Sequence, residues 1–116
     1  MEYKLIIVIV NKGYSTSVMD AARGASATGG TMIHARGTGS HMAEKLFGVA
    51  VQPEKEVIMI LSPSSSCDEI MRAVIAKAGL NTLGAGICFS LPVDNVLGIA
   101  AGINSGEDAE DAPKQM

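Results

Sequence analysis

The sequence predicts an α+β fold of the ferredoxin-like, split βαβ type, with elements in the order β-α-β-β-α-β. Each half of the chain combines an apolar strand, an amphipathic helix and a second strand. Glycines stand directly between helix and second strand in both halves, in ATGGTMI and TLGAGIC. The 116 residues suit one domain. Such a fold places four antiparallel strands under two helices and leaves one sheet face available for contacts between subunits.

The first half begins with YKLIIVIV, residues 3–10, a continuous and largely β-branched run. This pattern indicates a strand covered on both faces, or a central strand of an oligomer. Residues 15–17, Ser-Thr-Ser, offer N-caps for a helix over residues 18–27, which has a small-residue face. TMIHAR, residues 31–36, is predicted to be the second strand.

The second half begins with RGTGSHMAEKLFGVAVQPEKE, which we expect to be a long loop. A strand over residues 56–62 ends at a proline, and Ser66 with Glu69 forms a capping box for the helix that follows. Gly79 is placed as the C-terminal cap of that helix. A strand follows over residues 87–91 until Pro92 interrupts it, and VLGIAAGI suggests a short edge strand.

Composition and charge exclude some functions. The chain is 47% hydrophobic but only 3% aromatic, so Val, Ile, Leu, Met and Ala must form the core. The net charge of −3 comes from the tail after residue 103, and the body is neutral. A neutral body argues against a nucleic-acid partner. We therefore expect one domain over residues 1–103 and an acidic, disordered tail over residues 104–116.

The cysteines and the apolar runs indicate in which cellular compartment the protein works and whether it enters a membrane. Cys67 and Cys88 form no CxxC pair, and we see no signal peptide, so we expect a reduced, cytoplasmic setting. The longest apolar run, Leu5 to Val10, is too short to span a bilayer, so no membrane insertion is expected.

Catalytic and metal-binding signals are weak. Cys67 stands at a helix start, where the helix dipole would stabilise a thiolate, but no histidine is placed beside it, and we predict no enzyme. His34 and His41 are seven residues apart, with Glu44 near, so a two-histidine, one-carboxylate site is conceivable. The alternative is a strand histidine and a solvated loop histidine, and we predict no metal.

The glycine-rich turns RGTGS and LGAG can expose backbone N–H groups to an anion. Neither matches a Walker A or a GxGxxG fingerprint, so simple tight turns remain the alternative. Thr31, Arg36 and Thr38 could add donors to an anion, or they could be exposed sheet-edge residues.

The segment ATGGTMIHARGTG, the strand from Lys4 and the ending GAGICFSLPVDNVLGI together resemble the PII nitrogen-regulatory signalling family. The resemblance covers residues 1 to about 103 and is closest to the divergent PII-like branch. It implies a compact homotrimer that binds an adenine nucleotide between subunits. It also implies a long T-loop that docks on targets, often ammonium channels and other transporters.

The resemblance also implies which residues bind the effector: Thr31, Gly37, Thr38, Gly39, Leu61, Gly84, Ala85 and Gly86. The sequence departs from the family pattern where Ile87, Gly98 and Ala100 replace family cations that reach the phosphates. His41 replaces the loop glutamine that helps bind magnesium and 2-oxoglutarate. The glycines are left to bind a less charged nucleotide or another small anion, with Arg36 as a candidate cation.

The implied function is signalling by a small effector, with no obligatory cofactor and with a membrane transporter or a nitrogen-metabolism protein as partner. The loop from Gly39 to Gln52 would dock on the partner through its four apolar residues, Met42, Leu46, Phe47 and Val49. Alternatively, these four residues would pack on the rim of the trimer. An alternative is a structural or metal-responsive trimer without nucleotide, like the copper-tolerance trimers, in which His34 and His41 would matter more.

Overall fold

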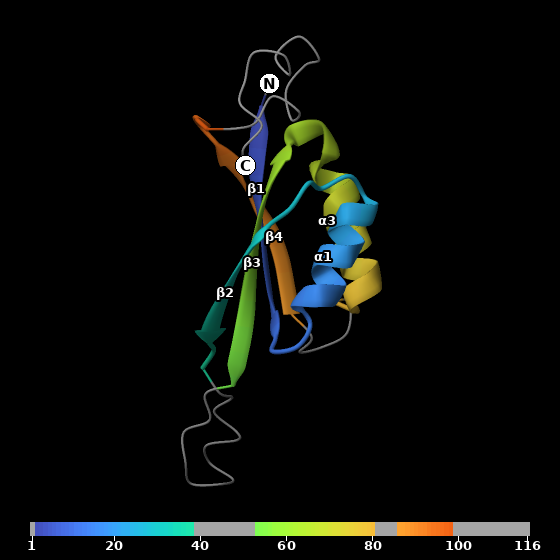
Figure 1. Cartoon of the computed structure of the whole chain (residues 1–116), viewed down its shortest axis with the longest axis vertical. Coiled ribbons are helices and arrows are strands. Elements are labelled where there is room, and N and C mark those ends of the chain that lie inside the picture. Colours follow the sequence, from blue (N-terminus) through green and yellow to red (C-terminus); the bar gives the residue numbers. More distant parts are fainter. Residues whose placement is uncertain (1, 39–52, 81–85, 99–116) are drawn as a thin grey trace, which may run out of the picture.

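The computed structural model describes residues 2–38, 53–80 and 86–98 and confirms the predicted order β-α-β-β-α-β (Figure 1). The elements are β1 (Tyr3–Asn11), α1 (Ser15–Gly24), β2 (Thr31–Arg36), β3 (Glu54–Pro63), α3 (Ser64–Ala78) and β4 (Gly86–Val93). Neither of the two helices in these ranges has the length and the apolar composition of a membrane span.

The four strands form one antiparallel sheet in the order β2-β3-β1-β4, and both helices lie on the same side of it (Figure 1). This is the predicted split βαβ topology. The central position of β1 explains its continuous apolar run. Its even-numbered side chains face the helices and its odd-numbered side chains face away.

The core lies between the helices and the sheet. Ile6, Val8 and Val10 on β1 are fully buried there, together with Ile58 and Ile60 on β3. The inner faces of the helices complete the cluster with Val18, Ala21, Ala22, Cys67, Ile70, Val74 and Ala78. Each buried isoleucine stabilises the fold by roughly 1.5–3 kcal/mol.

Among residues 2–38, 53–80 and 86–98, no helix lies on the opposite side of the sheet, and we call this side the open face. The described helices therefore cover β1 on one face only. Cross-strand pairing places these side chains on the open face: Tyr3, Leu5, Ile7, Ile9, Asn11, Thr31, Ile33, Ala35, Lys55, Val57, Met59, Leu61, Pro63, Ile87, Phe89, Leu91 and Val93.

The start of α1 differs from the prediction. Tyr14 occupies the N-cap, no side chain of the local Ser-Thr-Ser run caps the helix, and the helix ends at Gly24 instead of residue 27. Glu56 on β3 takes the role of the cap, because its Oε1 accepts hydrogen bonds from the backbone N–H groups of Gly13 (3.1 Å) and Ser15 (3.0 Å). A distant carboxylate thus satisfies these donors.

The predicted capping box of the second helix is wrong. α3 begins directly after Pro63, and no side chain makes a cap hydrogen bond there. The N–H of Ser64 donates to the carbonyl of Glu2 at 2.9 Å, so the N-terminal segment helps to fix the start. Gly79 is confirmed as the C-terminal cap, in the left-handed conformation with φ 71°.

The last strand also runs further than predicted. β4 continues through Pro92 to Val93, which an edge strand tolerates because one side of its backbone needs no partner. Residues 94–98 form no strand, and the rest of the predicted edge strand lies outside the described residues, as does the acidic tail.

Glu56 makes the fold sensitive to acid. Burial alone would raise the pKa of Glu56, but the hydrogen bonds from Ser15 and Gly13 and the charge of His34 outweigh burial and lower it. Since a lowered pKa means that the folded state favours the carboxylate, this stabilisation is present above about pH 4.3 and is lost as the pH falls through the folded pKa.

We therefore expect Glu56→Gln to lower the unfolding free energy by about 2 kcal/mol at neutral pH, because it loses charge-assisted hydrogen bonds. The difference from the original chain should shrink in acid, as measured by urea unfolding at several pH values. Glu54→Gln is the matched control, because Glu54 makes only an exposed ion pair with Lys12 at 3.4 Å. A difference that stays constant with pH would contradict this role for Glu56.

Candidate functional site

A hollow of about 440 Å³ lies where the linker from α1 enters β2. Thr31 and Leu61, two of the residues assigned to the effector site by resemblance, both line it. The complete lining is Leu5, Thr28, Gly29, Gly30, Thr31, Met59 and Leu61. The structure therefore brings together one part of the expected site within a single chain.

Gly30 explains how the linker comes so close to the sheet. A Cβ at this position would lie 2.9 Å from Sδ of Met19 and 3.1 Å from both Cγ1 of Ile60 and the carbonyl oxygen of Met59. Glycine therefore lets the chain pass between α1 and β3 here without displacing Met19, Ile60 or Met59. Gly29 has no other atom within 4 Å of such a Cβ, so its side faces open space.

The hollow combines apolar walls with a polar edge. Leu5, Met59 and Leu61 come from the open face, and Thr28 and Thr31 bring hydroxyl groups. Within the described residues, no backbone hydrogen bond occupies the peptide groups of Gly29 and Gly30. These groups can therefore bind a ligand's polar atoms.

A second group of predicted residues gathers at the base of the long loop. The N–H of Gly37 donates to the carbonyl of Pro53 at 2.9 Å, which closes the loop base. A Cβ on Gly37 would lie 3.1 Å from Cε of Lys55, so the lysine chain packs on this glycine. Nζ of Lys55 donates to Oδ1 of Asn11 at 2.6 Å. Arg36 and Thr38 are exposed beside them.

Lys55 was not among the predicted site residues. It stands at the loop base as a cation held in place by Asn11, and it could meet an anion there. In the sequence Lys55 stands between two glutamates, and this pattern is typical of a solvated run of charges. The strand register alone reveals that Lys55 lies on the open face opposite Ala35.

Gly86 lies at the opposite edge of the sheet from the loop base. It opens β4 and pairs with Val10, whereas Gly37 follows β2. One chain does not bring these glycines together, so a site that used both would need a second subunit. Gly39, Gly84 and Ala85 lie outside the described residues, as do the docking residues Met42, Leu46, Phe47 and Val49.

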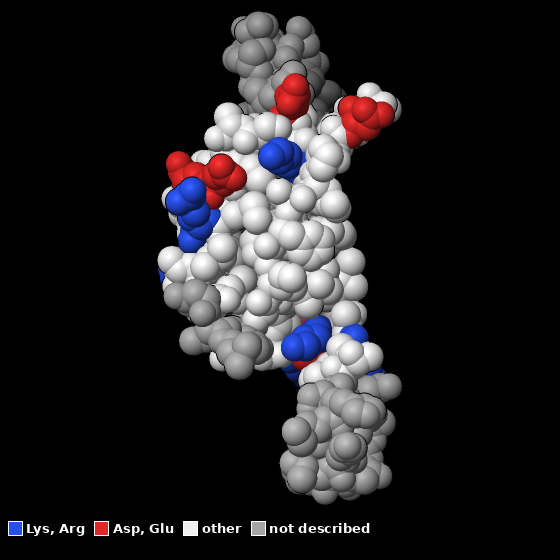
Figure 2. Space-filling model, turned by 180° about the vertical axis from the view of Figure 1, so that it is seen from behind, with Lys and Arg blue, Asp and Glu red and all other residues white. Residues whose placement is uncertain are grey.

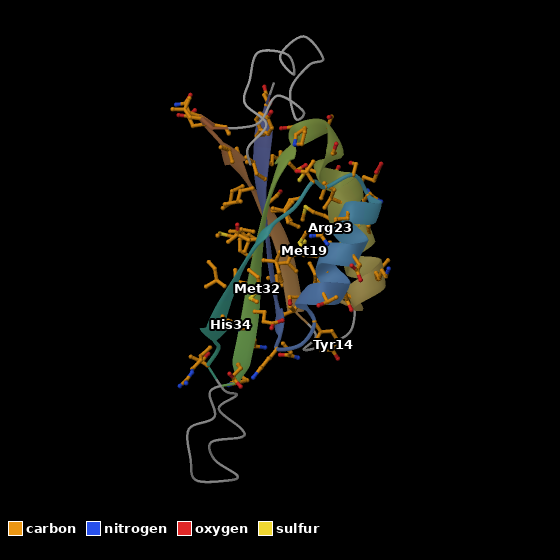
Figure 3. The ribbon with its side chains drawn as sticks, viewed as in Figure 1. Tyr14, Met19, Arg23, Met32 and His34 are labelled. Atoms are coloured by element: carbon orange, nitrogen blue, oxygen red, sulfur yellow. The ribbon has the colours of Figure 1, made fainter. Side chains whose placement is uncertain are left out.

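His34 faces the helix side of β2 and stands opposite Glu56 (Figure 3). The backbone N–H groups of Gly13 and Ser15 occupy one oxygen of that carboxylate. Among residues 2–38, 53–80 and 86–98, no three His, Cys, Asp or Glu side chains are grouped as a metal site. His41 and Glu44 fall outside these ranges.

The two cysteines lie at the core. Cys67 is 1% exposed, and its Sγ lies 3.7 Å from Sδ of Met71. Burial and the neighbouring Cys67 raise the pKa of the Cys88 thiol to about 11. The dipole-activated thiolate considered for Cys67 is therefore not presented to solvent.

Comparison with known proteins gives a consistent result. The family model described as nitrogen regulatory protein P-II matches residues 3–102. The solved structure of GlnK from B. subtilis is similar in fold, with a TM-score of 0.64 at 13% sequence identity, over 84% of this chain and 90% of that chain. No curated protein sequence matches significantly.

Proposed function

The chain belongs to the nitrogen regulatory protein P-II family, and from this premise we propose that it is a signalling homotrimer controlled by a small effector. The observation that carries the proposal is the apolar open face with a hollow at its margin. Membership of this family supports a regulatory role for the chain. The identities of the effector and of the partner belong to the proposal.

The open face supports the trimer. Ile87, Phe89 and Leu91 are 56%, 37% and 44% exposed in the single chain. Figure 2 shows that charged side chains gather toward the ends and one side of the molecule and leave its middle white. A contiguous apolar surface of this kind marks a contact between proteins. Three copies that turn their open faces toward a common axis would bury it.

The hollow and the loop base support the effector site. The hollow reaches from the open face to the exposed linker at the sheet edge, so a neighbouring copy would close it from one side. Gly37, which follows β2, and Lys55, near the start of β3, lie on either side of the loop base. A bound effector could thus change the ordering of the loop.

The loop from Gly39 to Gln52 is proposed to carry the signal. Met42, Leu46, Phe47 and Val49 would contact the partner, which we propose to be a membrane transporter or a nitrogen-metabolism enzyme. The cytoplasmic location, the domain limits and the absence of catalysis stay predictions.

The test combines a light-scattering measurement of the molecular mass with tryptic cleavage of the loop. Light scattering should give three times the 12.0 kDa of one chain. Lys45 is the single tryptic site between residues 39 and 52, and its cleavage rate should change when a bound effector reorders the loop. Lys45→Gln is the control that identifies the cleaved bond. A monomer would overturn the site between subunits, and an unchanged cleavage rate with saturating ligand would overturn signalling through the loop.

A further inference from the structure

We propose that Cys67, Met71 and Cys88 form a binding site for a soft monovalent metal ion such as Cu(I), between α3 and β4. All three side chains belong to the core cluster or pack against it, and we call them the sulfur cluster. None of them lines the hollow, and all belong to one chain, so the proposal is independent of the effector and of the trimer.

Helical spacing brings the first two sulfur atoms together. Cys67 and Met71 are four residues apart on α3, so their side chains lie on the same face of the helix. The thiol of Cys67 donates to Sδ of Met71, with 3.7 Å between the two sulfur atoms. Since a metal–sulfur bond is about 2.3 Å long, an ion in place of the thiol proton can bond to both sulfurs at an angle of roughly 107°. This angle is close to that of a tetrahedral site.

Cys88 brings the third sulfur from the sheet. It lies on the helix side of β4, because its partner on β1 is the buried Val8. There it packs against the core cluster that contains Cys67. The charge of Cys67 is one of the causes that raise the pKa of the Cys88 thiol, so the two groups interact. Helix and strand therefore both contribute sulfur to one place in the core.

The surroundings favour a soft ion with a single charge. The other residues of the core cluster are alanine, valine and isoleucine, whose side chains offer no oxygen or nitrogen ligand. Thiolate and thioether ligands suit Cu(I), whereas Mg²⁺ and Ca²⁺ prefer oxygen. Cys67 lies in the first turn of α3, where the helix dipole stabilises a thiolate. Cys88, with a pKa of about 11, keeps its proton at neutral pH.

Charge and proton balance agree with this choice of ion. Binding forms a bond from the metal to Sγ of Cys67 and releases the thiol proton to solvent. One thiolate with one monovalent ion is neutral, which an apolar region tolerates. A divalent ion on the same ligands would leave a positive charge in the core.

An ion can reach the sulfur cluster from the edge of the sheet. Cys67 is 1% exposed, but Met71 and Cys88 are only partly buried. β4 is the last strand in the sheet order, so no other strand of the described residues covers this side. The side chain of Met71 is unbranched and flexible, and it can move to admit the ion.

The experiment is an anaerobic titration of the reduced, full-length protein with Cu(I), in competition with a coloured Cu(I) chelator. One ion should bind per chain, and absorption from thiolate to Cu(I) should appear in the ultraviolet. Met71→Leu should weaken binding by at least about tenfold, because it keeps the volume of the side chain and removes the thioether. Met32→Leu is the matched control, since Met32 is exposed on the opposite edge strand, and it should bind Cu(I) as the original chain does.

The absence of Cu(I) binding overturns the inference, and so does full affinity of Met71→Leu, because the ion would then lie elsewhere. Zn²⁺ that displaces Cu(I) at equal concentration overturns it as well. Cys67→Ala should abolish the absorption, and thermal unfolding without metal shows whether this variant is folded. Cu(I) should raise the unfolding midpoint of the original chain more than that of Met71→Leu. Equal shifts in the two proteins would also contradict the sulfur cluster as the site.

Discussion

Replacing Gly86 with valine is expected to lower the unfolding free energy by about 3 kcal/mol, the upper part of the range for overpacked sites. A Cβ at this position would lie 2.5 Å from the carbonyl oxygen of Ile9. That oxygen belongs to the backbone of the central strand and cannot move without breaking the pairing of β1 with β4. Val10 Cγ1 and Leu80 Cδ2 crowd the same space at 3.0 and 3.1 Å. Equilibrium denaturation by urea measures the loss.

Gly24→Ala is the matched control, since a Cβ there meets no atom within 4 Å and the residue ends a helix. It should be neutral or stabilise the chain by up to about 0.5–1 kcal/mol. Equal stability of Gly86→Val and the original chain would refute the close contact. The resemblance assigns Gly86 to phosphate binding, but a Gly86 variant that loses ligand binding would first report a damaged sheet. Thr31 therefore gives the cleaner test of the site.

The fold was predictable because its signals are local. The apolar run of β1, the helical spacing of apolar residues and the glycine turns each depend on neighbouring residues. The helix starts were not predictable, because their partners are distant. Glu56 is 41 residues from Ser15, and the carbonyl of Glu2 fixes Ser64. Serine and threonine near both starts suggested local caps that the structure does not use.

The candidate site was predictable only in part. Thr31 and Leu61 came from the resemblance, and both line the hollow. Met59 and Lys55 give no sequence signal of their own, because their place on the open face depends on strand register. Periodicity also cannot tell what covers an apolar face. The run in β1 is equally consistent with a second helix layer or with another subunit.

Phe89→Glu is expected to convert the proposed trimer into monomers. Phe89 lies halfway along the edge strand β4 on the open face, in the row that pairs Thr31 with Met59 and Ile7 with Phe89. A carboxylate there would be buried without a partner in each of three subunits, which association cannot tolerate. Light scattering at several concentrations checks the mass. The core lies on the other side of the sheet, so the monomer should remain folded.

Met32→Glu is the control for Phe89→Glu, because Met32 is similarly exposed, at 41%, but lies on the helix side of β2 (Figure 3). It should remain trimeric, and a Phe89→Glu trimer would refute the open face as the interface. The folded Phe89→Glu monomer also shows whether the contact between subunits is needed for effector binding. All the lining residues of the hollow belong to one chain, so a monomer that still binds an adenine nucleotide would show that the hollow alone holds the ligand. A monomer that loses binding would show that the neighbouring copy completes the site, and effector binding would then stabilise the trimer.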